Sequence, residues 1–540
     1  MSAMVARQPE FAAPGVATTA PRTFGLTHDT VVVALVLIAA LAIRVHGLTA
    51  ESFWVDEGAT VTFMQAPLAY QWGEMPGYET NPPGYYTLMK GWSALFGGSD
   101  TALRAPGAIA GALCVLPVYF IALGVAGRRA AFAAAALVAL SAVSVRYAQE
   151  ARAFMPVTLA ALCALWAATA LAGRVASGVR TRAPFWAMVA GLALLPYLHY
   201  SAYLAVAAVL VALGTQLVLR GVAPAHMLRT VLTAGGAVAL LSAPCLYFVY
   251  TQLGSGAVAV GWIDHPTLAD SHAIYRAVFG YTALTPPESG ALAALLPGEA
   301  GLRRGANAVL LATAATGIVL GAHRRAWVVP ATAMALAFAI VAFHLVSQLQ
   351  PILLPRVVVW MVPWLLLLAG CALGWLPAPV ARVVLFVLLV LQAANLAAAV
   401  DRQRGEPWRE LVGTAGAAYT PGDAIVIIGT AVAVPALVDR YWPAAAAGEV
   451  PERLYMVHAA HPHLRRVTPA LHGRIEYLDA EAPCPALRGG GALHVVFRHA
   501  TTASAMHETL GAHLVAAGAV RGDSHVFERL ALERWSRPRC

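Results

Sequence analysis

Charged residues are scarce in this sequence. They make up 12% of the 540 residues, whereas soluble globular domains carry about 25%. Hydrophobic residues make up 59% of the chain, and the mean hydropathy is +0.67. These values exclude an ordinary soluble protein, because too few charged side chains remain to cover its surface. The composition therefore predicts an α-helical polytopic membrane protein.

Cysteine and lysine are also rare. Of the six cysteines, four lie in apolar segments, and Cys484 and Cys540 stand alone without CxxC spacing, which argues against a zinc site. Lys90 is the only lysine, so arginine carries nearly all of the positive charge. The arginines cluster in short loops between apolar segments. Membrane topology therefore explains the formal charge of +9 better than nucleic-acid binding does.

The sequence contains many long apolar segments. A membrane-spanning helix needs roughly 20 apolar residues, and about eleven segments qualify. They lie near residues 30–46, 103–124, 130–147, 156–173, 184–198, 201–219, 230–250, 306–322, 326–347, 357–376 and 382–400. The segment 85–96 is also apolar, but it is short and contains Lys90 and Trp92. We interpret it as an interfacial helix in the first outer loop, where Lys90 snorkels to the membrane surface.

The arginines orient these spans. If the first span runs outward and residues 85–96 do not cross, the arginine clusters all fall inside, as the positive-inside rule requires. These clusters are Arg128 with Arg129, Arg174 with Arg180 and Arg182, Arg220 with Arg229, Arg324 with Arg325, and Arg382. The same order places five segments outside: 47–102, 148–155, 251–305, 348–356 and the tail from residue 401.

Three domains are expected along the chain. Residues 1–28 are rich in Ala, Pro and Thr, which predicts a disordered cytoplasmic leader. Residues 29–400 form the transmembrane catalytic domain. The tail, 401–540, alternates strand-like runs at 424–428, 492–497 and 525–530 with helix-like runs at 432–441 and 504–517. This alternation predicts a small extracytoplasmic α/β domain, and it contains no glycine-rich phosphate loop.

Candidate functional residues gather on the predicted outer face. Asp56 and Glu57 follow the first span as an acidic pair flanked by aromatic side chains. Such a pair at a membrane boundary suggests an active site at the bilayer surface. The other candidates lie in outer loops or at the outer ends of spans: Asn81, Tyr85, Tyr86, Arg104, Tyr147, Glu150, Arg152, His199, Tyr200 and Arg356.

This set of side chains suits one kind of chemistry. Carboxylates can act as general bases or as metal ligands, and arginines can hold a phosphate. The combination indicates transfer from a phosphate-bearing substrate. A divalent cation on Asp56 and Glu150 is possible, but no cofactor is obligatory for such a reaction.

Several of these residues also have a structural interpretation. Asp56 and Glu57 could cap a helix in a solvated loop. Glu150 lies between two arginines and could form a structural ion pair. His199 could be an interfacial histidine, and Arg356 could anchor a lipid headgroup. An arginine on the outer face runs against the inside bias, however, and this favours a functional role for Arg356.

The order of the motifs resembles one known superfamily. After the acidic pair come NPPGYY, ALRAPG, RYAQEARAF, LHYSAY and LLPRVVVW, and together they resemble the bacterial GT-C glycosyltransferases. These are similar to protein O-mannosyltransferases and lipid A aminoarabinose transferases of the inner membrane. The resemblance implies a polyprenyl-phosphate sugar as donor, Asp56 as the catalytic base and Glu150 as the second acidic position. The family often has histidine at the position of Asn81.

The leading hypothesis is therefore an inverting glycosyltransferase on the outer face of a bacterial cytoplasmic membrane. Its acceptor could be a glycolipid, a polysaccharide or a protein. The main alternative is a transporter or flippase of lipid-linked sugars, which would show inverted repeats and charges near the bilayer midplane; neither is visible in the sequence. A third possibility is a scaffold that recruits cell-envelope partners through its tail.

Overall fold

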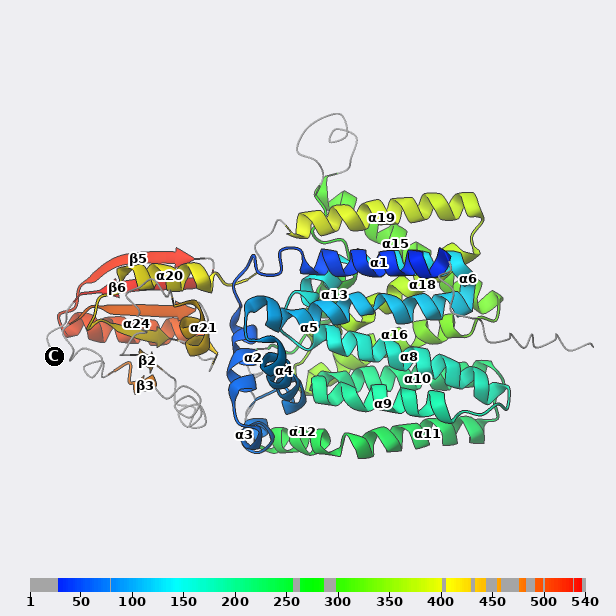
Figure 1. Ribbon diagram of the computed structural model, residues 1–540, viewed down its shortest axis with the longest axis horizontal. Helices are drawn as coiled ribbons and strands as arrows, with labels where there is room; N and C mark the ends of the chain where they lie inside the picture. Colours follow the sequence, from blue (N-terminus) through cyan, green and yellow to red (C-terminus); the bar gives the residue numbers. More distant parts are fainter. Residues whose placement is uncertain are drawn as a thin grey trace, which may run out of the picture.

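The computed structural model has two parts, a body of long parallel helices and a small sheet domain at one end of it (Figure 1). The structure describes residues 28–77, 79–255, 263–285, 298–400, 405–428, 433–442, 454–457, 475–481, 491–498, 501–527 and 529–536. Residues 1–27 of the predicted leader lie outside the described residues, and His28 begins α1. The short helices α2 and α4 lie at the end of the body that faces the sheet domain, and α3 lies next to α12 (Figure 1).

The helical body confirms the polytopic fold. It contains α1 (His28–Val45), α5 (Asp100–Leu113), α6 (Val115–Ala139), α7 (Ala142–Ala148), α8 (Phe154–Ala176), α9 (Arg182–Leu198), α10 (Tyr203–Leu219), α11 (Pro224–Leu241), α12 (Ala243–Ser255), α13 (Leu268–Phe279), α15 (Glu299–His323), α16 (Val328–Leu349), α17 (Pro355–Val358), α18 (Val362–Trp375) and α19 (Ala378–Val400). Within the described part of the chain, seven helices are long and apolar enough to cross a membrane, or eight if α11 and α12 form one bent span. Each predicted span falls on these helices, but the number eleven stays a prediction.

Two of the predicted spans meet inside α6. Gly127 has φ 81° and interrupts the helix, a left-handed conformation that glycine adopts without a steric penalty. Arg128 follows and bonds to Asp29 at the start of α1, while Arg129 donates to the carbonyl of Gly374 at the end of α18. The start of α1, the break in α6 and the end of α18 therefore meet at these arginines, as expected for one membrane face.

The predicted span 230–250 is not one continuous helix. It breaks between α11 and α12, which differ in direction by 70°. Pro244 lies directly after the break. Because proline has no backbone N–H and its ring clashes with the preceding turn, it cannot continue the helix from α11.

Small residues allow α6 and α18 to pack closely. A Cβ atom on Gly370 would lie 2.4 Å from Cβ of Ala134, and one on Gly374 would lie 2.7 Å from the carbonyl oxygen of Ala126. Lipid provides no hydrophobic drive between helices, so close backbone contact is what holds such pairs together. This pair runs through the centre of the body, since α18 is almost entirely buried.

The segment predicted to be the first outer loop folds as a set of short helices: α2 (Val55–Gln65), α3 (Leu68–Trp72), η1 (Met75–Gly77) and α4 (Pro83–Phe96). The prediction of a helix at 85–96 is confirmed, and Pro83 begins it, as its fixed φ favours. The snorkelling of Lys90 stays a prediction. Its Nζ donates to the carbonyls of Gln65 and Ala66, at 3.2 and 3.1 Å. A cation at that end of α2 is stabilised by the unpaired carbonyls and the helix dipole.

The tail forms the predicted α/β domain. Its strands are β1 (Ala424–Ile428), β2 (Leu454–Val457), β3 (Ile475–Leu478), β4 (Leu493–Arg498), β5 (Arg521–Phe527) and β6 (Leu530–Trp535), and its helices are α20 (Trp408–Ala418), α21 (Val434–Tyr441) and α24 (Thr501–Ala516). The sheet order is β3-β2-β1-β4-β6-β5, and β1 to β4 pair in parallel. The predicted strand at 525–530 is wrong, because β5 and β6 form an antiparallel hairpin across that segment.

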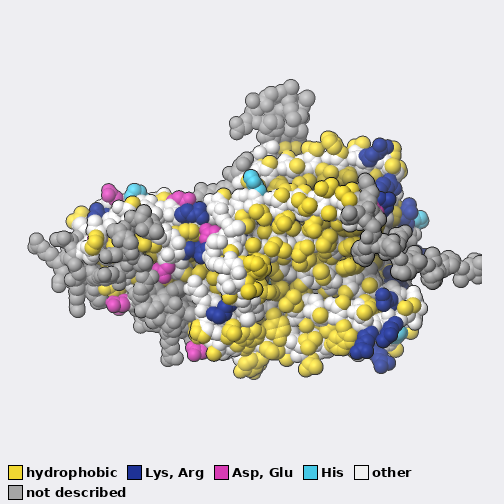
Figure 2. All heavy atoms as spheres, viewed as in Figure 1, with side chains coloured by type: hydrophobic (Ala, Val, Ile, Leu, Met, Phe, Trp, Pro, Cys, Tyr) yellow, Lys and Arg dark blue, Asp and Glu magenta, His cyan; other side chains and the backbone are white. Residues whose placement is uncertain are grey.

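The surface of the helical body is divided along its length. Figure 2 shows a broad hydrophobic band over the helices and a cluster of Lys and Arg side chains at the end away from the sheet domain. The sheet domain and the outer-loop helices therefore lie at the opposite end from that basic cluster. This is the distribution that the positive-inside rule predicts.

Candidate active site

Asp56 and Glu57 lie in the first turn of α2, and their surroundings differ. Trp54 precedes the helix in an extended conformation, and its backbone N–H donates to Glu57 Oε2 at 3.4 Å. Consecutive residues on a helix point about 100° apart, so one carboxylate faces inward and the other outward. The side chain of Glu57 has no exposed surface, whereas that of Asp56 is 26% exposed.

Glu57 is held by a paired contact with Arg104 of α5. Arg104 Nε donates to Oε1 at 2.8 Å and Nη2 donates to Oε2 at 2.6 Å, the two-point geometry that gives a strong charge-assisted bond. The backbone N–H of Ala151 also donates to Glu57 Oε1 at 2.8 Å. The charged groups of Glu57 and Arg104 thus bond to other groups of the protein. Glu57 was predicted to be catalytic and Arg104 to bind substrate.

Asp56 faces Arg356, the arginine that follows the first residue of α17. Arg356 Nη2 lies 3.6 Å from Asp56 Oδ2, and both side chains are partly exposed. The guanidinium of Arg356 also lies over the Trp54 ring, 5.5 Å from its centroid. Arg152 approaches from the other side and donates to the backbone carbonyl of Asp56 at 3.0 Å. The structure therefore brings together three residues that are up to 300 positions apart in sequence.

Glu150 belongs to the same group of charges. It lies in the loop between α7 and α8 and is half-buried, and its Oε2 atom is buried without a hydrogen-bond partner among the described residues. Burial, together with the negative charges of Glu57 and Asp56, raises the pKa of Glu150 to about 8, against the opposing effects of Arg146 and Arg356. Glu150 is therefore mostly protonated at neutral pH.

Glu79 is a further acidic residue of the site, and the sequence analysis missed it. It accepts hydrogen bonds from Asn81 Nδ2 at 2.6 Å and from the Tyr86 hydroxyl at 3.2 Å. Burial raises its pKa, and Arg152 opposes this effect. Asn81 and Tyr86 were predicted to bind substrate. The position of Glu79, two residues before Asn81, was therefore the sequence signal that could have identified it.

Arg152 is the residue that connects these groups. Its side chain is buried, and it forms a hydrogen bond with Tyr86 besides its contact with Asp56. Burial by itself would lower the pKa of Arg152, but the nearby Tyr86 and Asp56 raise it overall. Its Nε atom is buried without a partner among the described residues.

Three predicted residues surround this charged group. His199, which directly follows α9, accepts a hydrogen bond from the Ser201 backbone N–H through Nδ1. Burial and the positive charges of Arg152 and Arg356 lower the pKa of His199 to about 3, so its imidazole is neutral. The hydroxyls of Tyr85 and Tyr200 are buried and lack partners among the described side chains and backbone.

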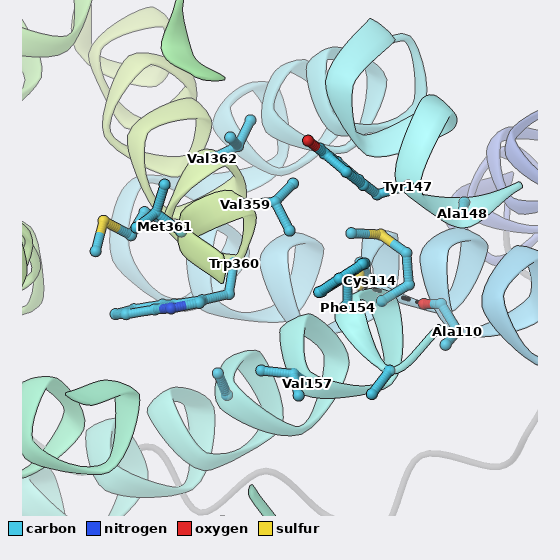
Figure 3. Packing of buried hydrophobic residues seen from close by; sticks show 14 of the residues in the cluster. Ala110, Cys114, Tyr147, Ala148, Phe154, Val157, Val359, Trp360, Met361 and Val362 are labelled. Atoms are coloured by element: carbon cyan, nitrogen blue, oxygen red, sulfur yellow. Dashed lines mark hydrogen bonds between the residues drawn. The ribbon is translucent and has the colours of Figure 1, made fainter. Parts of the chain in front are cut away.

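A layer of apolar side chains packs next to Tyr147, one of the predicted site residues. Val359 and Trp360 of η3 (Val359–Met361) pack against Phe154 and Val157 of α8 (Figure 3). Tyr147 of α7, a predicted substrate contact, lies in the same layer and meets the Phe154 ring edge-on at 5.5 Å. This close packing fixes η3, and α17 with Arg356 directly precedes it.

Metal binding remains a prediction. Within the part of the chain that the structure describes, no group of three or more His, Cys, Asp and Glu side chains could hold a metal ion. Asp56 and Glu150, the two predicted ligands, are close enough for the charge of Asp56 to raise the pKa of Glu150.

A cleft of about 600 Å³ lies between α2 and the sheet domain, and no candidate site residue lines it. Its walls come from α2, the start of α5, and α21: Val61, Gln65, Ser99, Asp100, Ala436, Asp439, Arg440 and Tyr441. The cleft joins the two parts of the molecule at the helix that carries Asp56.

Comparison with known proteins agrees with this fold. The family model described as dolichyl-phosphate-mannose-protein mannosyltransferase matches residues 80–255, which is less than half of the chain. No curated protein matches the sequence. The match begins just after Glu79 and includes Arg104, Glu150, Arg152 and His199.

Solved structures extend the likeness to nearly the whole chain. The crystal structure of ArnT from Cupriavidus metallidurans in the apo state has a TM-score of 0.59 at 14% identity, and the match covers 94% of this chain and 98% of ArnT. For ArnT bound to undecaprenyl phosphate the TM-score is 0.58 at 14% identity, with 93% and 97% covered. The oligosaccharyltransferase of Archaeoglobus fulgidus has a TM-score of 0.49 at 14% identity, with 93% and 70% covered. The chain therefore has the fold of ArnT, and this fold together with the family match supports a GT-C glycosyltransferase that resembles ArnT and the protein mannosyltransferases.

Proposed function

We propose that this protein transfers a sugar from a polyprenyl-phosphate donor to an acceptor hydroxyl at the outer face of a bacterial cytoplasmic membrane. The observation that carries the proposal is the partly exposed Asp56–Arg356 pair, a carboxylate and a cation 3.6 Å apart. It combines a candidate base with a candidate phosphate-binding group. The ArnT structure with undecaprenyl phosphate supports this class of donor.

In the proposed reaction Asp56 is the general base. The acceptor hydroxyl oxygen attacks the anomeric carbon, its proton passes to Asp56, and the bond from the anomeric carbon to the phosphate oxygen breaks. Polyprenyl phosphate leaves with the electron pair of that bond. A single displacement of this kind inverts the anomeric centre. Phosphate is already a good leaving group, so no strong general acid is required.

Arg356 would stabilise the phosphate as negative charge develops on it. A donor phosphate bound to Arg356 would also compete with Asp56 for the guanidinium and release the carboxylate toward the acceptor. Arg152 is buried and acts on the backbone of Asp56, so we assign it to holding the base in place. Glu57 and Arg104, bonded to each other, have the same supporting role.

The first test is a donor screen. The purified protein is incubated with a panel of polyprenyl-phosphate sugars, and release of polyprenyl phosphate is measured. A glycosyltransferase releases polyprenyl phosphate from one of these donors, whereas a transporter or flippase would move the donor without cleaving it. No release from any donor, in the presence of envelope extracts as acceptor, would contradict the proposal.

The second test separates the base from the phosphate-binding group. Asp56→Asn keeps the shape of the side chain but cannot accept the proton, so we expect turnover to fall by about 10²–10⁴-fold with donor binding retained. Arg356→Ala should instead weaken donor binding, because it removes a charge-assisted contact to phosphate. Initial rates and polyprenyl-phosphate binding distinguish the two variants. Near-normal turnover of Asp56→Asn would contradict this role for Asp56 and would mean that another carboxylate is the base.

A further inference from the structure

We infer that the sheet domain positions the catalytic base, and that Glu406 and Tyr441 are the positioning residues. This inference rests on the proposed function, because it concerns the placement of Asp56. It assigns the tail a role other than the recruitment of cell-envelope partners that the sequence left open. Both residues bond to the backbone of the segment that begins α2, and they act on Asp56 through that backbone.

Glu406 binds the first residue of the helix. Its Oε2 atom accepts the backbone N–H of Val55 at 3.2 Å, and its backbone carbonyl accepts the hydroxyl of Ser52 at 2.8 Å. The first N–H groups of a helix have no partner within the helix. A carboxylate at that position supplies one and also interacts favourably with the helix dipole. Val55 directly precedes Asp56, so this bond fixes the backbone next to the base.

Tyr441 binds two residues earlier. Its hydroxyl accepts the backbone N–H of Phe53 at 2.7 Å and donates to Asp100 Oδ2 at 3.0 Å. Arg440 of the same helix, α21, also donates a hydrogen bond from Nε to Asp100 Oδ1. The last two residues of α21 therefore connect the chain before α2 to the start of α5.

The ring of Phe53 contacts cations from both parts of the molecule. Arg104 of α5 lies 4.7 Å from the ring centroid, and Arg440 of α21 lies 4.5 Å from it. Phe53 itself is fully buried. Cation–π contacts of this kind strengthen when they are shielded from water, so arginines of the helical body and of the sheet domain both stabilise the segment before α2.

The two parts also touch along α2. A Cβ atom on Gly58 would lie 2.8 Å from Leu437 Cγ and 3.1 Å from the carbonyl oxygen of Ala433. Only glycine allows α21 to approach α2 this closely. Gly58 is two residues after Asp56, so contacts with the sheet domain occur on both sides of the base.

The exposure of the ion pairs near the start of α2 distinguishes the proposed base from the residues that position it. Each of three carboxylates pairs with an arginine from a different element: Glu57 with Arg104 of α5, Asp56 with Arg356 of α17, and Glu406 with Arg498 of β4. Of these three pairs, the Asp56 pair alone has both partners partly exposed. The other two pairs are held in contacts that orient the first turn of α2.

Positioning of this kind has a large kinetic effect. A displacement of about 1 Å at a reacting group can cost about 10²-fold in rate. Donor binding depends instead on groups such as Arg356, which belongs to the helical body. Loss of positioning should therefore lower kcat while it leaves the donor KM nearly unchanged.

The test uses full-length variants of the two residues. Tyr441→Phe removes the acceptor for Phe53 but keeps the ring, and Glu406→Ala removes the acceptor for Val55. We expect each to lower kcat by about 10-fold or more, with the donor KM within about 2-fold of the original value. Glu406→Gln keeps an oxygen that can accept the Val55 N–H, so it should restore much of the lost rate. Hydrogen exchange of the backbone amides in 53–58 should accelerate in Glu406→Ala and Tyr441→Phe.

Asp423→Asn is the matched control. Asp423 is a buried carboxylate of the same domain, and it accepts the backbone N–H of Ala492 and bonds to His494 rather than to α2. This variant should weaken the sheet domain without changing kcat. An equal loss of kcat in Asp423→Asn would mean that the domain matters only through its stability, and that result would overturn the inference.

The remaining outcomes also decide between the two proposals. Unchanged kcat and unchanged amide exchange in the Glu406→Ala and Tyr441→Phe double variant would overturn the positioning role, even if Asp56→Asn is inactive. If Asp56→Asn retains its turnover, the proposed base fails instead. Faster amide exchange in the double variant would then still establish that the domain holds the start of α2.

Discussion

At the level of single residues, three carboxylates near the start of α2 have three different environments. Glu57 is fully buried and bonded to Arg104, Asp56 is partly exposed beside Arg356, and Glu150 has a buried oxygen without a partner among the described residues. The same chemical group is therefore a structural ion pair, a candidate base and a mostly neutral acid. Burial and neighbouring charge determine which of these each carboxylate becomes.

The raised pKa of Glu150 predicts a pH dependence. Below pH about 8 Glu150 is protonated, and above it the residue ionises next to Asp56. The added negative charge should weaken binding of the donor phosphate, so the donor KM should rise as the pH increases through about 8. Glu150→Gln stays neutral, and its donor KM should remain flat over that range. Initial rates measured from about two pH units below this pKa to about two above it would give both profiles.

Glu74→Gln is the control for this prediction, because Glu74 is an exposed carboxylate of the same outer loop. It removes one negative charge without changing the buried one. Its pH profile should match that of the original protein. A profile of Glu150→Gln that also matches would show that another group causes the alkaline change.

At the level of elements, small residues determine which helices pack at the centre of the body. Ala134 of α6 faces Gly370 of α18, and the backbones come close enough that no larger side chain fits between them. η3, which directly precedes α18, contributes Val359 and Trp360 to the apolar layer that contains Tyr147 (Figure 3). The α6–α18 contact therefore fixes the position of Arg356 indirectly.

Gly370→Ala should destabilise the protein for this reason. The added methyl group would lie 2.4 Å from Ala134 Cβ and 2.9 Å from the Ala134 backbone nitrogen, and overpacking of this kind costs about 1–3 kcal/mol. Gly124→Ala in α6 is the matched control, since a Cβ atom on Gly124 would meet no other atom within 4 Å among the described residues and alanine favours a helix. Thermal unfolding in detergent would compare them. Equal unfolding temperatures for the two variants would contradict the packing argument.

At the level of the whole molecule, charge is distributed between two ends. The basic cluster lies at one end of the helical body and the sheet domain at the other (Figure 2). If the basic end is cytoplasmic, the site and the sheet domain lie outside. A lipid donor could then reach Arg356 from the bilayer and a polar acceptor could reach Asp56 from the solvent.

Reporter fusions test this orientation. Fusions after Arg129 and Arg182 should report a cytoplasmic location, and a fusion after Cys540 should report an outer one, because arginine-rich loops stay inside. The fusions use the full chain up to each point. A cytoplasmic signal from the fusion after Cys540 would place the sheet domain on the wrong side for the proposed acceptor.

The amino-acid sequence alone locates the long apolar helices, although it does not reveal the break between α11 and α12. In lipid every backbone polar group must be satisfied internally, so long apolar runs can only form helices, and these runs can be read without the fold. The acidic pair, Glu150, Arg152 and Arg356 were also recognisable, because charge near a membrane boundary is costly and rarely accidental. The parallel strands β1 and β4 were predicted from their apolar runs as well.

The differences among the carboxylates and the contacts of the tail emerge only when the chain is folded. Adjacent acidic residues look alike in sequence. In the folded chain Glu57 is buried beside Arg104, whereas Asp56 is partly exposed. Glu406 lies 351 positions from Val55, and no local pattern links a residue after the last span to the first outer loop. The strand boundary between β5 and β6 was missed for a similar reason, since pairing between strands fixes it. Long-range contacts of this kind depend on how the helices and the sheet pack, and that packing is a property of the whole chain.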